Sequence, residues 1–269
     1  MDARPIGVFD SGFGGLTVVR ALMDLVPQER LVYLGDTGRY PYGPRPLEEV
    51  RAFALQIAKY LVGEHGVKLL VVACNTAAAA ALDELVAAVD VPVVGVIEPG
   101  VRAMLRVTET GRVGVIGTVG TIGSGAYQRS VGQACERGGT TAELVCAACP
   151  GFVEFVERGD LGSDQVHVLA ERLLAPLRES EVDTLLLGCT HYPFLARTIA
   201  DVMGPEVVLV SSAEETAFEV RSVLGRLDMS SPGPGGQQFS SSGDVEWFRA
   251  LGARLLGMEI ARVEPVDWD

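Results

Sequence analysis

Short apolar runs alternate with amphipathic stretches along most of the 269-residue sequence, and this alternation constrains the fold more than any other feature. Apolar runs are typical of parallel strands buried on both faces, and the stretches between them have helical periodicity. The pattern therefore predicts an α/β fold with parallel sheets. The expected strands are Ile6–Phe9, Leu31–Leu34, Leu69–Ala73, Val93–Ile97, Arg112–Gly117, Glu143–Ala147, Thr184–Gly188 and Glu206–Val210. The expected helices are Gly15–Leu25, Pro46–Glu64, Thr76–Val89, Gly125–Arg137, Asp164–Glu179 and Phe194–Met203.

The two halves of this pattern resemble each other in sequence. Ile6–Thr17 has a counterpart in Val113–Gly123, since each is a strand that opens into a turn rich in Gly, Ser and Thr. Leu69–Thr76 has a counterpart in Thr184–His191, and in both a cysteine follows the apolar run. We therefore predict two similar parallel-sheet α/β domains related by pseudo-two-fold symmetry, with the active site between them.

The C-terminal part of the chain is expected to return to the first domain. Glu98–Gly100 is the expected hinge between the domains, and Ser230–Gln237 has the composition of a flexible linker. Beyond it, Val245–Leu256 is amphipathic and Glu259–Val263 is an expected strand, so this segment should pack on a core. The predicted first domain is discontinuous and comprises residues 1–98 and 211–269, and the second comprises residues 99–210.

Charge and hydropathy exclude two classes of protein. The 22 Lys and Arg residues are outnumbered by 35 Asp and Glu residues, which gives a formal net charge of -13. Nucleic acid is therefore not expected as the main partner, because phosphate backbones select basic surfaces. The longest apolar stretch, Leu69–Leu82, is interrupted by Asn75 and Thr76 and is shorter than the roughly 18 residues that span a bilayer. Since the N-terminal residues lack a signal-peptide pattern, we expect a cytoplasmic protein without a membrane partner.

The five cysteines do not fit a disulfide framework, because their number is odd. Cys146 and Cys149 form a C-x-x-C pattern, but no second ligand pair stands at zinc spacing, so no metal site is predicted. We expect these two and Cys135 to be structural. The glycine-rich segment Gly12–Gly15 is not a dinucleotide fingerprint, and no phosphate-binding loop motif occurs, so no nucleotide cofactor is predicted.

The other two cysteines, Cys74 and Cys189, stand where chemistry is expected. Each follows an apolar strand and precedes a helix, and ligands bind at the carboxyl ends of parallel strands. A helix N-terminus, with His191 close to Cys189, favours the thiolate form. A free cysteine is more often a buried apolar residue, but two at matching places indicate two bases on opposite faces of one substrate. This pattern predicts racemisation or epimerisation without a cofactor.

Two other functions remain open on these residues alone. Cys189 and His191 could form the nucleophile and base of a hydrolase, in which case Cys74 would have no role. Alternatively, the chain could be a binding protein whose main task is to hold a partner. Substitution of Cys74 separates the two-base reaction from the hydrolase, because only the former depends on that thiol.

The sequence resembles the cofactor-independent glutamate racemases over nearly its whole length. The motifs that carry the resemblance occur in the family's order. They are Phe9–Gly15, Gly35–Pro46, Cys74–Thr76, Gly117–Tyr127, Gly188–Pro193 and Phe239–Asp244.

The resemblance implies the interconversion of L- and D-glutamate, which supplies D-glutamate for peptidoglycan synthesis and so for the cell wall and cell shape. It also implies a homodimer. Cys74 is expected to act on the D-enantiomer and Cys189 on the L-enantiomer. Asp10, His191 and Glu157 are the expected helpers, although Glu154 is the alternative helper because it stands where the family more often has proline. The implied substrate contacts are Asp10, Ser11, Tyr42, Gly43, Asn75, Thr76, Thr118, Thr121, Thr190 and His191.

Two aspartates also have a purely structural interpretation. Asp10 in Asp-Ser-Gly could merely cap the turn that follows, but the resemblance favours a catalytic role. Asp36 is expected to hold the Pro41–Gly43 loop through hydrogen bonds to the loop backbone.

Overall fold

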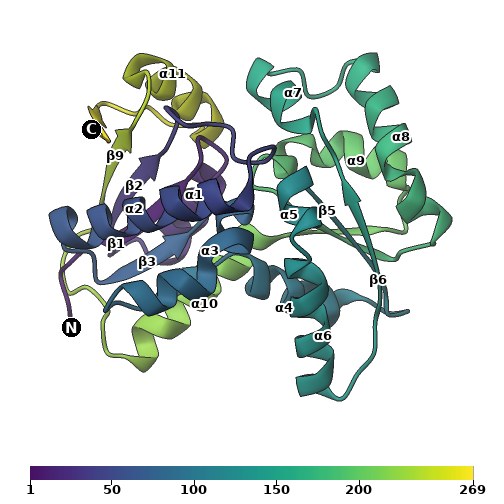
Figure 1. The fold of residues 1–269 in the computed structure, drawn as a ribbon, viewed down its shortest axis with the longest axis horizontal. Coiled ribbons are helices and arrows are strands. Elements are labelled where there is room, and N and C mark those ends of the chain that lie inside the picture. The colour runs from purple at the N-terminus through teal and green to yellow at the C-terminus, as the bar shows by residue number, and fades with distance from the viewer. Residues whose placement is uncertain (269) are drawn as a thin grey trace.

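The structure, a computed structural model, describes residues 1–268. Within this range the strands form two parallel sheets, which confirms the predicted α/β class with two parallel-sheet domains (Figure 1). The first sheet contains β1 (Ile6–Asp10), β2 (Arg30–Gly35), β3 (Leu69–Val72), β4 (Val93–Gly95), β9 (Gly236–Ser241) and β10 (Val263–Pro265). The second contains β5 (Arg112–Gly117), β6 (Glu143–Ala148), β7 (Thr184–Gly188) and β8 (Val208–Ser211).

The helices divide between the two lobes that Figure 1 shows side by side, with α4 (Ile97–Val107) near their junction. Those of the first lobe are α1 (Leu16–Leu25), α2 (Leu47–His65), α3 (Asn75–Ala88), α10 (Ser212–Arg226) and α11 (Val245–Leu256). Those of the second are α5 (Val119–Gly123), α6 (Ala126–Gly138), α7 (Phe152–Arg158), α8 (Asp164–Glu179), α9 (Ala196–Met203) and the 3-10 helix η1 (Tyr192–Leu195). Among residues 1–268, no helix has both the length and the apolar character needed to span a bilayer.

The two sheets share a strand order. The first runs β10-β9-β2-β1-β3-β4 and the second runs β6-β5-β7-β8. Thus β1 lies between β2 and β3, as β5 lies between β6 and β7, and all of these pairs are parallel. The sequence likeness of the two halves therefore corresponds to equivalent strands. As a result, Cys74 after β3 and Cys189 after β7 occupy equivalent positions in the two sheets.

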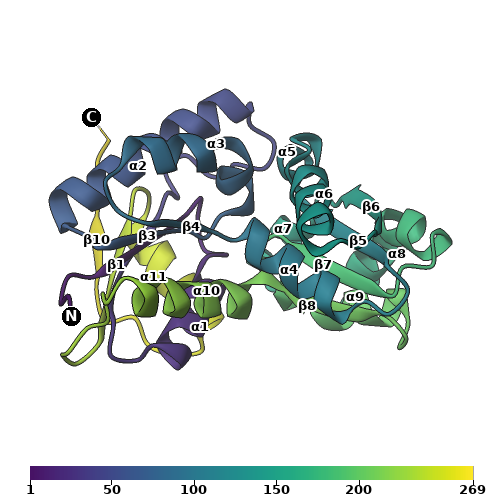
Figure 2. The same cartoon turned by 90° about the horizontal axis from the view of Figure 1, so that it is seen from below.

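Helices cover both faces of each sheet, so the strands lie in the interior. In the first lobe, α2 and α3 lie on one face, and α1, α10 and α11 lie on the other (Figure 2). In the second lobe, α8 packs against β6 and α9, whereas α4 packs against β7, β8 and α6. The strands β1, β3 and β7 are buried along their whole length, as expected for near-continuous apolar strands of a parallel sheet.

The chain crosses between the lobes at the starts of α4 and α10. These helices contact each other, and a Cβ atom on Gly100 of α4 would lie 3.0 Å from Cβ of Ser212 at the start of α10. The predicted boundary between residues 98 and 99 falls inside the first turn of α4, and that between residues 210 and 211 falls within the end of β8. The division of the chain into domains stays a prediction.

The segment Glu98–Gly100, the expected hinge, lies in the first turn of α4, and its role as a hinge stays a prediction. The predicted strand Val93–Ile97 ends at Gly95 as β4, and Ile97 already begins α4. Proline is tolerated in the first turn of a helix, where its missing N–H has no partner to lose. Gly100 lets α4 approach its neighbours closely, since a Cβ there would also lie 3.1 Å from Leu186 of β7.

The C-terminal segment packs on the first sheet, although its bounds differ from the expected ones. Part of the expected linker Ser230–Gln237 belongs to β9, which begins at Gly236 and pairs with β2. The last strand is Val263–Pro265 and not Glu259–Val263, and it pairs with β9. Both differences arise because pairing with an existing sheet edge, and not local composition, decides where these strands lie.

Candidate active site

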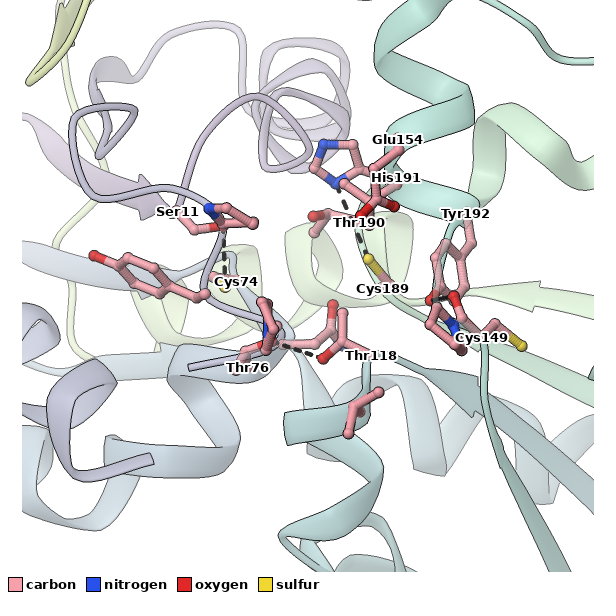
Figure 3. A pocket seen from close by; sticks show the side chains of 18 of the residues that line it. Ser11, Cys74, Thr76, Thr118, Cys149, Glu154, Cys189, Thr190, His191 and Tyr192 are labelled. Carbon is pink, nitrogen blue, oxygen red and sulfur yellow. Dashed lines mark hydrogen bonds between the residues drawn. The ribbon is translucent and has the colours of Figure 1, made fainter. Parts of the chain in front are cut away.

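A cavity opens between the carboxyl ends of the two sheets. Figure 3 shows Ser11, Cys74 and Thr76 on one side of it and Cys189, Thr190 and His191 on the other. Its position agrees with the general rule that ligands bind at the carboxyl ends of parallel strands. Most of the predicted site residues line this cavity: Ser11, Tyr42, Gly43, Cys74, Asn75, Thr76, Thr118, Cys189, Thr190 and His191.

Cys74 stands at the N-terminus of α3 in the first lobe. It is 5% exposed, its Sγ accepts a hydrogen bond from the Ala77 amide at 3.5 Å, and it donates to Ser11 Oγ at 3.7 Å. Burial, together with the charge of Asp10, raises the pKa of the Cys74 thiol to about 12. The thiol form of Cys74 is therefore favoured at neutral pH.

Cys189 has a different partner in the second lobe. Its Sγ lies 4.0 Å from Nδ1 of His191, and the side chain is 6% exposed. Burial acts to lower the pKa of His191, but the interactions with Cys189 and Glu157 outweigh it and raise the pKa to about 10. A protonated imidazole at neutral pH therefore lies beside the Cys189 sulfur atom.

The helper carboxylate of the second lobe comes from α7. Oε1 of Glu157 lies 3.3 Å from Nε2 of His191, so Glu157 contacts the ring nitrogen that does not face Cys189. Glu154 lies one turn earlier in α7 and lines the cavity itself. Both candidate glutamates are thus at the site, with Glu157 behind the histidine and Glu154 at the wall.

Asp10 lies behind the cavity wall at the end of β1. It is fully buried, and it accepts hydrogen bonds from the Gly12 amide at 2.9 Å and from Thr190 Oγ1 of the other lobe at 3.4 Å. Burial raises the pKa of Asp10, against the opposing charge of His191. The carboxylate therefore caps its turn, as the structural interpretation expected, and also links the turn to the second lobe.

The turn after β1 approaches the second lobe so closely that it requires glycine. A Cβ atom on Gly14 would lie 2.1 Å from Oγ1 of Thr190 and 2.5 Å from Nδ1 of His191. No heavy atom fits at such distances, so any side chain at this position must displace the residues around Cys189.

Three threonine hydroxyls connect the lobes beneath the cavity. Thr76 Oγ1 lies 3.0 Å from Thr118 Oγ1 and 3.1 Å from Thr121 Oγ1, and the latter two are 2.9 Å apart. Thr118 and Thr76 line the cavity, whereas Thr121 is fully buried behind them. Hydroxyls can donate or accept, so this cluster can rearrange toward an anionic ligand.

Asn75 offers a buried acceptor at the same place. Its amide nitrogen donates to Tyr127 OH at 2.8 Å, but its Oδ1 atom is buried without a hydrogen-bond partner. A buried amide oxygen of this kind is unusual, and a ligand ammonium group or a hydroxyl would satisfy it.

The loop between β2 and α2 brings further residues to the cavity. The Asp36 carboxylate holds this loop by accepting a hydrogen bond from the Tyr42 hydroxyl, a side-chain donor, and not from the backbone of Pro41–Gly43 as expected. The Gly43 carbonyl accepts from the Gly120 amide of α5 at 2.9 Å, across the gap between the lobes.

Sequence reasoning missed nearly half of the cavity wall. These residues come from loops and from the first turns of short helices, whose positions are decided by contacts between the lobes, and the C-x-x-C pattern had drawn attention to Cys149 only as a structural cysteine. They are Tyr40, Pro41, Pro44, Val119, Cys149, Pro150, Gly151, Val153 and Tyr192. Within residues 1–268, no group of three or more His, Cys, Asp or Glu side chains could hold a metal ion.

Taken together, the cavity presents two thiols on opposite walls, with a histidine beside one and a buried carboxylate near the other. Neutral donors, namely hydroxyls and the amides at the start of α3, surround them and suit a carboxylate ligand. Such a site can remove a proton from one face of a bound carbon acid and return one on the other face.

Known proteins resemble this chain over nearly its full length. The profile of the Asp/Glu/Hydantoin racemase family matches residues 15–218. The glutamate racemase of Mycobacterium ulcerans (strain Agy99) is 53% identical over 265 residues, which cover 97% of this chain and 96% of the relative.

Solved structures agree with this likeness. A glutamate racemase isoform from Bacillus anthracis has a TM-score of 0.94 and 40% identity, covering 100% of this chain and 99% of that chain. The glutamate racemase from Francisella tularensis in complex with D-glutamate has a TM-score of 0.92 and 33% identity, with the same coverage. The segment that matches the family profile includes both Cys74 and Cys189.

Proposed function

This chain belongs to the Asp/Glu/hydantoin racemase family, and we propose that it interconverts L- and D-glutamate by two-base proton transfer without a cofactor. The observation that carries the proposal is the presence of Cys74 and Cys189 on opposite walls of one cavity, at the ends of equivalent strands. The choice of glutamate is supported by relatives that bear the name glutamate racemase, one of them solved with D-glutamate bound.

In the direction from L to D, the Cys189 thiolate takes the α-proton and becomes a thiol. The electron pair left on the α-carbon is delocalised into the α-carboxylate, and the Cys74 thiol then donates its proton to the opposite face. Cys74 ends the step as a thiolate, so the enzyme is left ready for the reverse reaction. Exchange of protons with water restores the starting form.

The surrounding residues fit the needs of each thiol. His191 stabilises the thiolate of Cys189, and Glu157 holds the imidazole in its protonated form from the far side. Cys74, whose pKa is raised to about 12 by burial, is held as the proton donor. In the proposed mechanism Cys74 therefore starts as the proton donor in the direction from L to D.

The substrate carboxylates are expected to take hydrogen bonds from the threonine hydroxyls and from Ser11. The unpartnered Oδ1 atom of Asn75 would accept from the substrate ammonium group. These contacts use neutral donors, so the net charge of -13 does not oppose an anionic substrate.

The test is NMR of L- and D-glutamate incubated with the enzyme in D2O, without added pyridoxal phosphate. Wild type should invert both enantiomers and incorporate α-deuterium. Cys74→Ser should still exchange the α-proton of L-glutamate through Cys189, and Cys189→Ser should still exchange that of D-glutamate, while both variants lose inversion by at least about 100-fold. Cys146→Ser is the matched control, because Cys146 is half-buried in β6 and does not line the cavity.

Other results would point elsewhere. If wild type leaves both enantiomers of glutamate unexchanged although it is folded, the glutamate reaction is refuted, and aspartate is the next substrate to try. If Cys74→Ser keeps full inversion, the two-base mechanism is refuted, and the Cys189–His191 pair of a hydrolase becomes the better explanation.

In the cell, the reaction would supply D-glutamate for peptidoglycan. Depletion of the protein should then arrest growth and alter cell shape, and added D-glutamate should restore both if it enters the cell. Failure of imported D-glutamate to restore growth would refute this role. We also propose a cytoplasmic homodimer, for which sedimentation should give twice the 28.5 kDa chain mass and fractionation should recover the protein with the cytosol.

A further inference from the structure

One buried carboxylate outside the cavity joins three distant segments of the first lobe. Asp36, directly after β2, is fully buried and each of its oxygens has two donors. Oδ1 accepts from Ser242 Oγ at 2.6 Å and from Trp268 Nε1 at 2.8 Å. Oδ2 accepts from Arg39 Nε at 2.7 Å and from the Tyr42 hydroxyl. The donors therefore come from the loop after β2, the loop after β9 and the segment after β10.

Trp268 has a second role at the same place. The guanidinium carbon of Arg39 lies 4.5 Å from the Trp268 ring centre and 4.2 Å from the Phe53 ring centre. Arg39 is thus held between two aromatic faces while it pairs with Asp36. The indole contributes both a hydrogen bond to the carboxylate and a face to the cation.

These contacts lead directly to the cavity wall. Residues 36–46, between β2 and α2, are called the cavity loop here, and they include Tyr42 and Gly43. The hydroxyl of Tyr42 is fixed by Asp36, and the Gly43 carbonyl accepts from the Gly120 amide of the other lobe at 2.9 Å. A shift of Asp36 would therefore move the wall residues that face the substrate.

We propose that Trp268, from the segment after β10, is a positioning residue for the substrate cavity. Trp268 holds Asp36 and Arg39 in place. These two residues in turn hold the cavity loop in the position in which Tyr42 and Gly43 line the cavity. Trp268 itself does not line the cavity, so its effect on the reaction passes through the loop. The kinetic consequence rests on the proposed glutamate reaction, whereas the structural consequence does not.

The test compares Trp268→Ala, which removes both contacts, with Trp268→Phe, which keeps a ring on Arg39 but removes the N–H. Trp247→Phe is the matched control, because Trp247 is 44% exposed on α11 and packs on Phe13, away from Asp36. Amide hydrogen exchange measured by mass spectrometry reports directly how often the backbone of the cavity loop opens. It does not depend on catalytic activity. Steady-state kinetics with both enantiomers of glutamate report substrate binding in the cavity through KM and turnover through kcat.

We expect Trp268→Ala to speed amide exchange in residues 36–46 by about tenfold while exchange in β1 and β3 stays as in wild type. KM for both enantiomers should rise by about tenfold with kcat changed less than about threefold, because a displaced wall weakens binding of substrate and transition state alike. Trp268→Phe should fall between wild type and Trp268→Ala, and Trp247→Phe should match wild type.

Unchanged exchange in the cavity loop would overturn the proposal, and so would an unchanged KM in an active enzyme. Faster exchange in β1 and β3 as well would also overturn it, because Trp268 would then only stabilise the whole lobe. If Trp268→Ala does not fold, Trp268→Phe decides by the same criteria. If wild type does not act on glutamate, the proposed function fails, and the exchange measurement still decides on Trp268.

Discussion

Sγ of Cys189 lies 4.0 Å from Nδ1 of His191, whereas the nearest hydrogen-bonding groups to Cys74 are a serine hydroxyl and a backbone amide. The two thiols thus stand at equivalent strand ends but differ in the charge beside them. Cys189 has the imidazole of His191 beside it, whose pKa is raised to about 10. Cys74 is buried and lies near the carboxylate of Asp10, and both effects raise the pKa of its thiol to about 12.

This difference predicts unequal reactivity toward alkylating agents, since the thiolate is the nucleophile. At pH 8, iodoacetamide should modify Cys189 faster than Cys74 by at least about tenfold. Peptide mass spectrometry at increasing times measures both rates in one sample. Glutamate should protect both sites if it fills the cavity, and equal rates without ligand would contradict the assigned ionisation.

The exchange of D-glutamate should depend steeply on pH in Cys189→Ser. In this variant the reaction needs the Cys74 thiolate, whose fraction rises about tenfold per pH unit below a pKa of about 12. The rate of α-deuterium incorporation should therefore increase from pH 7 to 10. L-glutamate exchange in Cys74→Ser should rise less steeply, because His191, with a pKa of about 10, stays protonated over most of this range. A flat profile for D-glutamate would be inconsistent with a buried neutral thiol.

Replacement of His191 by Asn should affect the two half-reactions differently. Loss of the imidazolium removes the cation beside Cys189, so exchange of L-glutamate in a Cys74→Ser background should fall by about 100-fold. Exchange of D-glutamate in a Cys189→Ser background should change by less than about tenfold. For the complete reaction, kcat/KM must fall equally in both directions, because the two enantiomers have equal free energy in water. Equal losses in the two half-reactions would argue against the pairing of His191 with Cys189.

Gly14→Ala should abolish activity while the chain still folds. The added Cβ would meet Thr190 Oγ1 at 2.1 Å and His191 Nδ1 at 2.5 Å, so the wall that carries Cys189 must move. Racemisation and thermal unfolding are the measurements, and we expect at least about a 100-fold loss of kcat/KM. Gly63→Ala in α2 is the matched control, because no heavy atom lies within 4 Å of a Cβ there. The control should be slightly stabilised, since alanine favours a helix over glycine.

Lys68 and Glu29 form a buried ion pair remote from the cavity. Lys68 Nζ lies 2.6 Å from Glu29 Oε2, and both side chains are fully buried. Lys68→Met leaves Glu29 as an unpaired buried charge, which should lower the free energy of unfolding by about 3–5 kcal/mol. Urea denaturation measures this, and Glu29→Gln added to Lys68→Met should recover part of the loss. Lys59→Met on the exposed side of α2 should change stability by less than about 0.5 kcal/mol.

The residues that face the substrate could be predicted where they follow strands. Cys74 and Cys189 are signalled by an apolar run, a cysteine and a helix start, and the repeat of that pattern distinguishes them from the other cysteines. Tyr40, Val119 and Tyr192 carry no such signal. Their positions depend on how one lobe meets the other, and periodicity within a segment contains no information about that contact.

Two of the helices that were not expected, α4 and α10, were missed for different reasons. For α10 a signal was present, because Ser211 with Glu214 three residues later is a capping-box pattern, and Ser211 Oγ does accept a bond from the Ala213 amide. For α4 the local signal misled, because Pro99 and Gly100 suggest a break. Their roles become apparent only once the packing against Leu186 and Ser212 is known.

The adjacency of Gly100 and Ser212 has a mechanical consequence. The two lobes are therefore joined by two neighbouring passages of the chain and not by a single one. A double connection restricts how one lobe can turn relative to the other more than a single connection would, and this helps to keep Cys74 and Cys189 on opposite walls of one cavity.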